Sequence, residues 1–457
     1  GTHTFLSQTI ANGNQIGNYD VNNSEAFDGS IDQVRIFNSA LNASQVASLY
    51  NEVYCVPTIV PTDNFEPVIY TGNGTTQSIT NVGFEPDLVW IKERSSGSSH
   101  NIADVVRGST NYLSSNLPNA QSNLASTISS FDSNGFSVGN DGGVNQSAQT
   151  YVAWNWKAGG AAVSNTDGTI TSQVSANVDA GFSIVKFAGG NSSGTTVGHG
   201  LTQPIELLIV KNLNDGSDNW ITWHKDVEQN STSNNTFTLK GGSVLLLNST
   251  SGTIPSYAYD GQMGSASGEN LIAYAFHSVD GFSKIGSYTG TGATGNTIVT
   301  GFRPAFVMFK RASAGATTGW FMLDNKRSTG NVWNVRLQAD VSSAEVGPDS
   351  YTITTSSNGF EPTGSFATFS GSNASGATYI FMAFAEEGLP TVTRNATNPF
   401  GDSSELALYK FEDNATNSED NVTASSTSVT YASGYIDKAA VFNGSTSHID
   451  FTSPIPY

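Results

Sequence analysis

The sequence has little charge, and most of that charge is acidic. Charged residues make up 12% of the 457 residues, and 38 Asp and Glu outnumber 19 Lys and Arg, which gives a formal net charge of −19. The phosphates of nucleic acids and anionic membrane surfaces repel a chain of this sign. We therefore expect neither a nucleic acid nor a lipid surface as a partner.

Cysteine and long apolar runs are also scarce. The single cysteine, Cys55, excludes an intrachain disulfide framework. No apolar run reaches the ~20 residues of a membrane-spanning helix, so we expect no membrane insertion. The chain opens on Gly1 without a signal peptide. We expect it to be either processed or a part of a longer polypeptide.

What the sequence has is typical of β-structure. Gly, Ser, Thr and Asn fill much of the chain, and 25 Phe, 16 Tyr and 7 Trp can fill several small cores. The apolar residues come in runs of strand length, which disordered chains lack. The composition therefore favours a folded, β-rich protein.

One motif occurs three times, at a period of roughly 110 residues, which suits tandem β-domains better than a solenoid. Its copies are residues 83–92 (GFEPDLVWIK), 200–211 (GLTQPIELLIVK) and 301–310 (GFRPAFVMFK). In each copy a Gly and a Pro open a β-branched and aromatic run that ends in Lys. This pattern predicts a turn that leads into a buried strand.

The repeats close on runs that are apolar on both faces, at residues 151–156, 271–276 and 379–384. Such runs predict central strands that are covered on two sides. An antiparallel sandwich for each repeat buries them. We place the three sandwiches at residues 66–158, 159–278 and 279–388.

The two ends of the chain carry another pattern. Residues 26–51 read AFDGSIDQVRIFNSALNASQVASLYN, and residues 405–411 and 438–445 read ELALYKF and KAAVFNGS. The first stretch resembles the C-terminal half of a laminin-G-like, concanavalin-A-type jelly roll, and the other two resemble its N-terminal half. Proline-containing linkers at 55–65 and 389–401 would separate these halves, 1–54 and 402–457, from the repeats. The expected fold class is all-β, with tandem antiparallel β-sandwiches flanked by split jelly-roll halves.

The inverted order of the two halves leaves three explanations open. The chain can be a segment of a longer polypeptide in which jelly rolls alternate with the three-repeat block. Residues 402–457 of one subunit can instead complete residues 1–54 of the next by strand complementation. Pairing of the halves within one chain is favoured less, because three intervening domains must then loop back.

Three patterns resemble catalytic or cofactor motifs, and none has the required context. Residues 190–194 (GNSSG) and 290–295 (GTGATG) match nucleophile-elbow and dinucleotide patterns as text, but both fall at predicted Gly-rich turns rather than at helix starts. Glu386 and Glu387 are consecutive in a strand, so they point to opposite faces and are expected to be solvated. The six histidines show no metal-ligand spacing, and His224 is expected to be half-buried. We therefore expect no enzyme.

One metal site is conceivable in the jelly-roll halves, since loops of laminin-G-like jelly rolls often carry Ca²⁺. Hard oxygen ligands gather in this sequence at Asp413, Asn417 and Asp420 in one half and at Asp28 and Asp32 in the other. Solvated turns explain the same residues, and we favour that explanation.

The repeat block, with GFEPDLVWIK and TYVAWNWKA in its first copy, resembles domains found in tail-fibre-like structural proteins of tailed bacteriophages, notably marine ones. The resemblance implies a virion appendage: a fibre, spike or decoration protein that presents carbohydrate-binding-type sandwiches to a host-surface glycan. Homo-oligomers or neighbouring copies in the particle are the expected partners. A secreted adhesin or surface-layer-like filament protein is the alternative, and a glycan-degrading enzyme lacks an acid pair.

Overall fold

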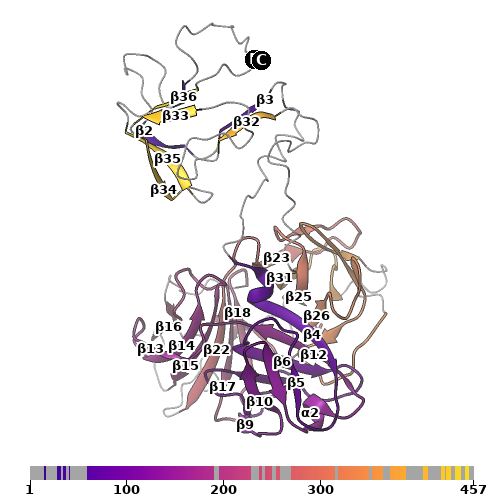
Figure 1. Ribbon diagram of the computed structural model, residues 1–457. Coiled ribbons are helices and arrows are strands. Elements are labelled where there is room, and N and C mark those ends of the chain that lie inside the picture. The colour runs from indigo at the N-terminus through magenta and orange to yellow at the C-terminus, as the bar shows by residue number, and fades with distance from the viewer. Residues whose placement is uncertain are drawn as a thin grey trace. The chain divides into compact units, whose positions relative to one another are not determined.

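The computed structural model divides the chain into two compact units. The terminal unit consists of Gly1–Cys55 and Pro390–Tyr457, and the central unit consists of Val56–Leu389 (Figure 1). The structure describes residues 59–189, 195–227, 236–238, 242–249, 254–257, 269–313, 317–348, 352–363 and 371–386, and in the terminal unit residues 15–16, 28–31, 34–37, 41, 405–409, 424–427, 429–433, 438–443 and 448–451.

The described part of the terminal unit is built from strands of both ends of the chain. Its strands are β1 (Gln15–Ile16), β2 (Asp28–Ile31), β3 (Val34–Phe37), β32 (Glu405–Tyr409), β33 (Ala424–Thr427), β34 (Thr430–Ser433), β35 (Lys438–Asn443) and β36 (His448–Phe451). Three antiparallel pairs join the two ends: β1 with β36, β2 with β35 and β3 with β32. The halves therefore pair within one chain, which corrects the favoured expectation that residues outside the chain complete them.

Packing at the two ends of the central unit explains this correction. Phe65 lies at the start of this unit and Phe384 near its end, and their rings stack with centroids 4.7 Å apart. The three repeats therefore do not have to be spanned by a long return segment. The chain enters and leaves the central unit at neighbouring points.

Repeat 1 is a sandwich of two sheets, ordered β4-β12-β6-β7 and β10-β11-β5, with a small β8-β9 hairpin. Its elements are η1 (Pro61–Asp63), β4 (Phe65–Thr71), β5 (Gln77–Ile79), β6 (Leu88–Glu93), β7 (Asn101–Asp104), β8 (Asn111–Tyr112), β9 (Ser122–Asn123), β10 (Ile128–Asp132), β11 (Gly135–Val138), α2 (Gly142–Asn145) and β12 (Thr150–Trp156). Ile59 and Phe65, which the sequence assigned to a linker, are buried in the central hydrophobic cluster that the three repeats share.

Repeat 2 contributes an eight-stranded sheet, β13-β14-β15-β22-β17-β18-β20-β21, and a β16-β19 pair. The strands are β13 (Val163–Asn165), β14 (Ser172–Asn177), β15 (Phe182–Ala188), β16 (Thr196–Gly198), β17 (Leu207–Asn212), β18 (Ile221–His224), β19 (Thr236–Thr238), β20 (Gly242–Leu246), β21 (Ile254–Tyr257) and β22 (Asn270–Phe276).

Repeat 3 again has two sheets, β23-β31-β25-β26-β28 and β24-β30-β29-β27. Its strands are β23 (Ser283–Thr289), β24 (Ile298–Val299), β25 (Pro304–Arg311), β26 (Phe321–Asp324), β27 (Val332–Trp333), β28 (Leu337–Gln338), β29 (Thr352–Ser356), β30 (Gly359–Thr363) and β31 (Thr378–Ala385). The predicted all-β class with antiparallel sheets is confirmed.

The same four-strand order recurs in all three repeats, as β4-β12-β6-β7, β15-β22-β17-β18 and β23-β31-β25-β26. The predicted closing strands β12, β22 and β31 are central and paired on both sides, as expected. The glycines that open the motif, Gly83, Gly200 and Gly301, have φ of 95°, 73° and 91°. Only glycine adopts this left-handed region without strain, which explains its place in the turn.

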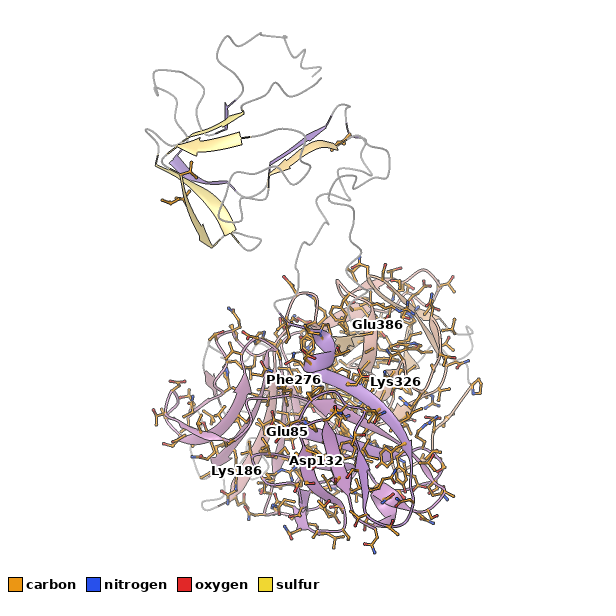
Figure 2. The ribbon with its side chains drawn as sticks, viewed as in Figure 1. Glu85, Asp132, Lys186, Phe276, Lys326 and Glu386 are labelled. Atoms are coloured by element: carbon orange, nitrogen blue, oxygen red, sulfur yellow. The ribbon has the colours of Figure 1, made fainter. Side chains whose placement is uncertain are left out.

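The sequence did not predict that the three repeats share a core. Along β12, Val152, Trp154 and Trp156 belong to a central hydrophobic cluster, whereas Tyr151 and Ala153 belong to a smaller cluster inside repeat 1. Repeats 2 and 3 likewise have clusters of their own and contribute their other strand faces to the central one. Phe276, labelled in Figure 2, is one of these central residues and is only 3% exposed.

Candidate functional site

The motif lysines are the first candidates for a functional site, because all three are buried. Lys92, Lys211 and Lys310 hold the same register, opposite Val152, Ile272 and Ile380 of the closing strands, and each is 0% exposed. Burial lowers the pKa of each lysine to about 8.

Backbone carbonyls satisfy these ammonium groups. Lys211 Nζ donates to the carbonyls of Asn212 (2.7 Å) and Asp215 (3.2 Å). Lys310 Nζ donates to Thr318 of its own loop (2.6 Å) and to Ser249 of repeat 2 (3.1 Å). The lysines therefore anchor the loops that follow β6, β17 and β25. A buried ammonium that is held by carbonyls is a structural arrangement rather than a free nucleophile.

Each repeat contacts a neighbouring repeat through the residue four positions before the end of β7, β18 or β26. These residues are His100, Trp220 and Trp320. Trp220 Nε1 donates to the carbonyl of Ser114 in repeat 1 at 2.9 Å, and Trp320 Nε1 donates to Leu246 in repeat 2 at 2.9 Å.

The third contact of this kind joins repeat 1 to repeat 3. His100 Nε2 lies 3.0 Å from the carbonyl oxygen of Gln338. The three contacts run from repeat 2 to 1, from 3 to 2 and from 1 to 3. The three repeats therefore form a closed ring.

Buried ion pairs lie at two junctions of this ring. Between repeats 1 and 2, Asp104 accepts from Arg107 Nε (2.5 Å) and from the hydroxyl of Tyr274 (2.8 Å). Between repeats 3 and 1, Asp324 accepts from Arg327 Nε (2.7 Å) and from Trp154 Nε1 (3.0 Å). The side chains of both ion pairs are 0% exposed.

The third junction has a different chemistry. His224 occupies the position of Asp104 and Asp324 at the end of its strand, and it is 1% exposed rather than half-buried as the sequence suggested. Burial lowers the pKa of His224 to about 4, so the imidazole of His224 is uncharged at neutral pH. Among the described residues, the junction between repeats 2 and 3 therefore has a neutral imidazole where the other two junctions have a buried ion pair.

These buried groups have no access for a substrate. The central core contains a cavity of about 20 Å³, lined by apolar side chains of all three repeats, such as Trp90, Tyr274 and Met308. One water is the most that such a volume holds, and an apolar lining leaves it dry. The ion pairs lie in the dry interior, and their role is to hold neighbouring repeats together.

An open groove of about 720 Å³ lies on repeat 2. Val174, Ala176 and Leu201 provide apolar surface, and Asn165 and Asp167 add polar groups at the edge strand β13 and the turn after it. Its volume lies within the ~300–1,000 Å³ range of small-molecule sites.

Most of the residues predicted to bind calcium lie outside the described part of the chain. Asp413, Asn417, Asp420 and Asp32 lie outside the described residues, and of Asp28 only the backbone is described, in β2. Among the described residues, no group of three or more His, Cys, Asp or Glu side chains is placed to hold a metal ion.

The other sequence patterns have different outcomes. Residues 190–194 and Glu387 lie outside the described residues. Residues 290–295 form a turn between β23 and β24 with no helix after it, as predicted. Glu386 was expected to be solvated; it is partly exposed and forms an ion pair with Arg303, with its Oε1 2.9 Å from Arg303 Nε. No helix in the described part of the chain has the length and apolarity to cross a bilayer.

Sequence reasoning missed the junction ion pairs, although a signal was present. Asp104 and Arg107 in repeat 1 and Asp324 and Arg327 in repeat 3 have the same spacing after the same strand.

A domain of unknown function, DUF7483, matches residues 60–388. The chain belongs to this family. The matched range covers nearly all of the central unit, and no curated protein or solved structure matches the sequence.

Proposed function

We propose that the protein is a non-enzymatic structural component of a virion appendage that presents its β-sandwiches to a host-surface glycan. The observation that carries this proposal is the closed ring of three repeats. Its buried charged groups connect one repeat to the next, where an enzyme would direct such groups at a substrate. A rigid module of this kind suits load-bearing and display.

Two further features support the proposal. The strands of the terminal unit come from both ends of the chain, and its sequence resembles laminin-G-like jelly rolls. The groove on repeat 2 offers a second surface for a ligand. Neighbouring copies in the particle would bring several such surfaces together, so that weak individual contacts add up through avidity.

Location in the particle is the test of this proposal. Mass spectrometry of purified particles of the virus that carries the gene should find the chain at a stoichiometry of several copies. Antibodies against the central unit should label the appendage in electron micrographs. Absence from the particle together with display on a bacterial surface would instead favour the adhesin alternative. Hydrolysis of a host polysaccharide that is lost on changing one carboxylate would overturn the non-enzymatic assignment.

A further inference from the structure

Arg311 of repeat 3 differs from the other arginines of the described central unit in the partners of its side chain. Arg94, Arg107, Arg303 and Arg327 form ion pairs with carboxylates, and Arg336 donates to Gln338. Among the described residues, the Arg311 side chain has neither an ion pair nor a hydrogen bond; its Nε is buried, although the residue as a whole is partly exposed. A buried charged donor without a partner costs more than an ordinary unpaired group.

The equivalent positions in the other repeats show how unusual this is. By strand register, Arg311 lies opposite Tyr379 of its closing strand, as Glu93 lies opposite Tyr151 and Asn212 opposite Leu271.

The backbone around the three positions is also alike. Two residues after each position, a side-chain oxygen of Ser95, Asn214 or Ser313 accepts from the first residue of the closing strand, at 3.0, 2.6 and 3.0 Å. The three side chains therefore start from the same place in the fold.

In repeats 1 and 2, side chains of the loop that follows the strand form hydrogen bonds with the residue at this position. Glu93 accepts from the hydroxyls of Ser96 (2.6 Å) and Ser98. Asn212 Nδ2 donates to Asp218 at 2.7 Å. Both positions are 0% exposed and need nothing from outside.

In repeat 3 neither side of the equivalent contact has a partner within the described fold, and Arg311 and Thr318 are both partly exposed, so an outside group can reach these side chains. Thr318 lies two residues before Trp320, as Ser98 and Asp218 lie two residues before His100 and Trp220. The hydroxyl of Thr318, like Arg311 Nε, is buried and without a partner. A guanidinium and a hydroxyl are donors that together suit an anionic oxygen group.

We propose that Arg311 and Thr318 bind the acidic group of a saccharide, a carboxylate or sulfate ester, at the end of the repeat 3 sandwich. This inference rests on the proposed glycan-binding function and names its ligand class. The net charge of −19 repels anions in general. The guanidinium of Arg311 supplies the attraction for the acidic group, and binding weakens as ionic strength rises.

The experiment is a titration of the full chain with defined probes at low and high salt. The probes are a uronic acid oligosaccharide, a sulfated oligosaccharide, a neutral oligosaccharide of the same length, and inorganic sulfate. We expect one acidic oligosaccharide to bind at least tenfold more tightly than either the neutral oligosaccharide or sulfate. Arg311→Gln should weaken this binding at least tenfold, and Thr318→Ala should weaken it several-fold.

Arg303→Gln is the matched control, because Arg303 already pairs with Glu386. It should change the affinity less than twofold. Arg311→Gln should keep the wild-type urea midpoint, since Arg311 makes no ion pair in the fold. Equal binding by wild type and Arg311→Gln, or no binding of any acidic probe, would overturn the proposal.

Sulfate that binds as tightly as the oligosaccharides would overturn the assignment to a saccharide. The proposed function fails by a different observation, absence from the particle. Arg311→Gln has no expected effect on that localisation, so the two failures are distinguishable.

Discussion

At the scale of single residues, one position differs in charge between the repeats. Asn116, Asn248 and Asp340 each accept a hydrogen bond from the backbone N–H of the residue that crosses to the next repeat. Burial raises the pKa of Asp340, and one of its carboxyl oxygens is buried without a partner. In the other two repeats, the neutral side-chain amide of Asn116 or Asn248 accepts the equivalent hydrogen bond.

Asp340→Asn should therefore fold and be at least as stable as wild type at neutral pH. Because the folded pKa of Asp340 is raised, the folded state holds its proton to higher pH than the unfolded state, and stability falls as pH rises through that window. Urea unfolding at several pH values should show this fall in wild type and not in Asp340→Asn. The reverse exchange, Asn116→Asp, should cost at most about 1 kcal/mol, because Asn116 is only partly buried. A fall of unchanged size in Asp340→Asn would contradict the assignment.

His224 predicts a pH dependence of the opposite sense. The pKa of His224 is lowered to about 4 by burial, and the charged groups that face it are Asp226, which raises the pKa, and Lys225, which lowers it. The unfolded chain binds this proton near pH 6.5, so stability should fall as pH drops from about 6.5 to 4, by on the order of 3 kcal/mol. His224→Asn should reduce the slope of unfolding free energy against pH by up to one proton in this window. An unaltered slope would show that His224 does not titrate as described.

At the scale of elements, the strands and turns that were predicted correctly are those that a local sequence pattern determines. The closing strands were recognisable because residues 151–156 and their counterparts are apolar on both faces, and the turn at 290–295 was recognisable from its glycines. The burial of His224 was underestimated, because its cover comes from repeat 3, where the backbones of Gly286 and Phe381 lie against it, both far along the chain from His224. The junction contacts could not be derived, since Trp154 and Asp324 are 170 residues apart and no local pattern indicates that their side chains meet.

The junction ion pairs predict a difference between buried and exposed arginines. Arg107→Met and Arg327→Met each leave a buried aspartate without its partner and should cost about 3–5 kcal/mol in unfolding free energy. Arg303→Met removes a pair whose members are 26% and 22% exposed, and it should cost at most about 1 kcal/mol. Urea midpoints of the three variants provide the comparison. Equal losses in all three would argue against dry junctions.

At the scale of the whole molecule, the ring explains how both ends of the chain can build one terminal unit. Phe65 and Phe384 meet where the first and last repeats join, so the segments that leave the central unit start close together. A string of independent sandwiches would place them far apart. The shared core also makes the three repeats dependent on one another.

This dependence predicts how hydrogen exchange responds to a local change. Weakening the junction between repeats 3 and 1 by Arg327→Met should lower the protection of β6 and β17 as well as that of β25, because all three strands pack on the central cluster. Exchange measured by mass spectrometry under native conditions reports each strand separately. Loss of protection confined to repeat 3 would indicate independent modules.

The closed ring is tested most directly by a double-mutant cycle across the contact that joins the last repeat to the first. Trp154 Nε1 donates to Asp324 at 3.0 Å, and the cycle compares Trp154→Phe, Asp324→Asn and the double variant by urea unfolding. The ring predicts a coupling energy of about 1–3 kcal/mol between these two residues. Additive effects, within about 0.5 kcal/mol, would contradict a closed ring.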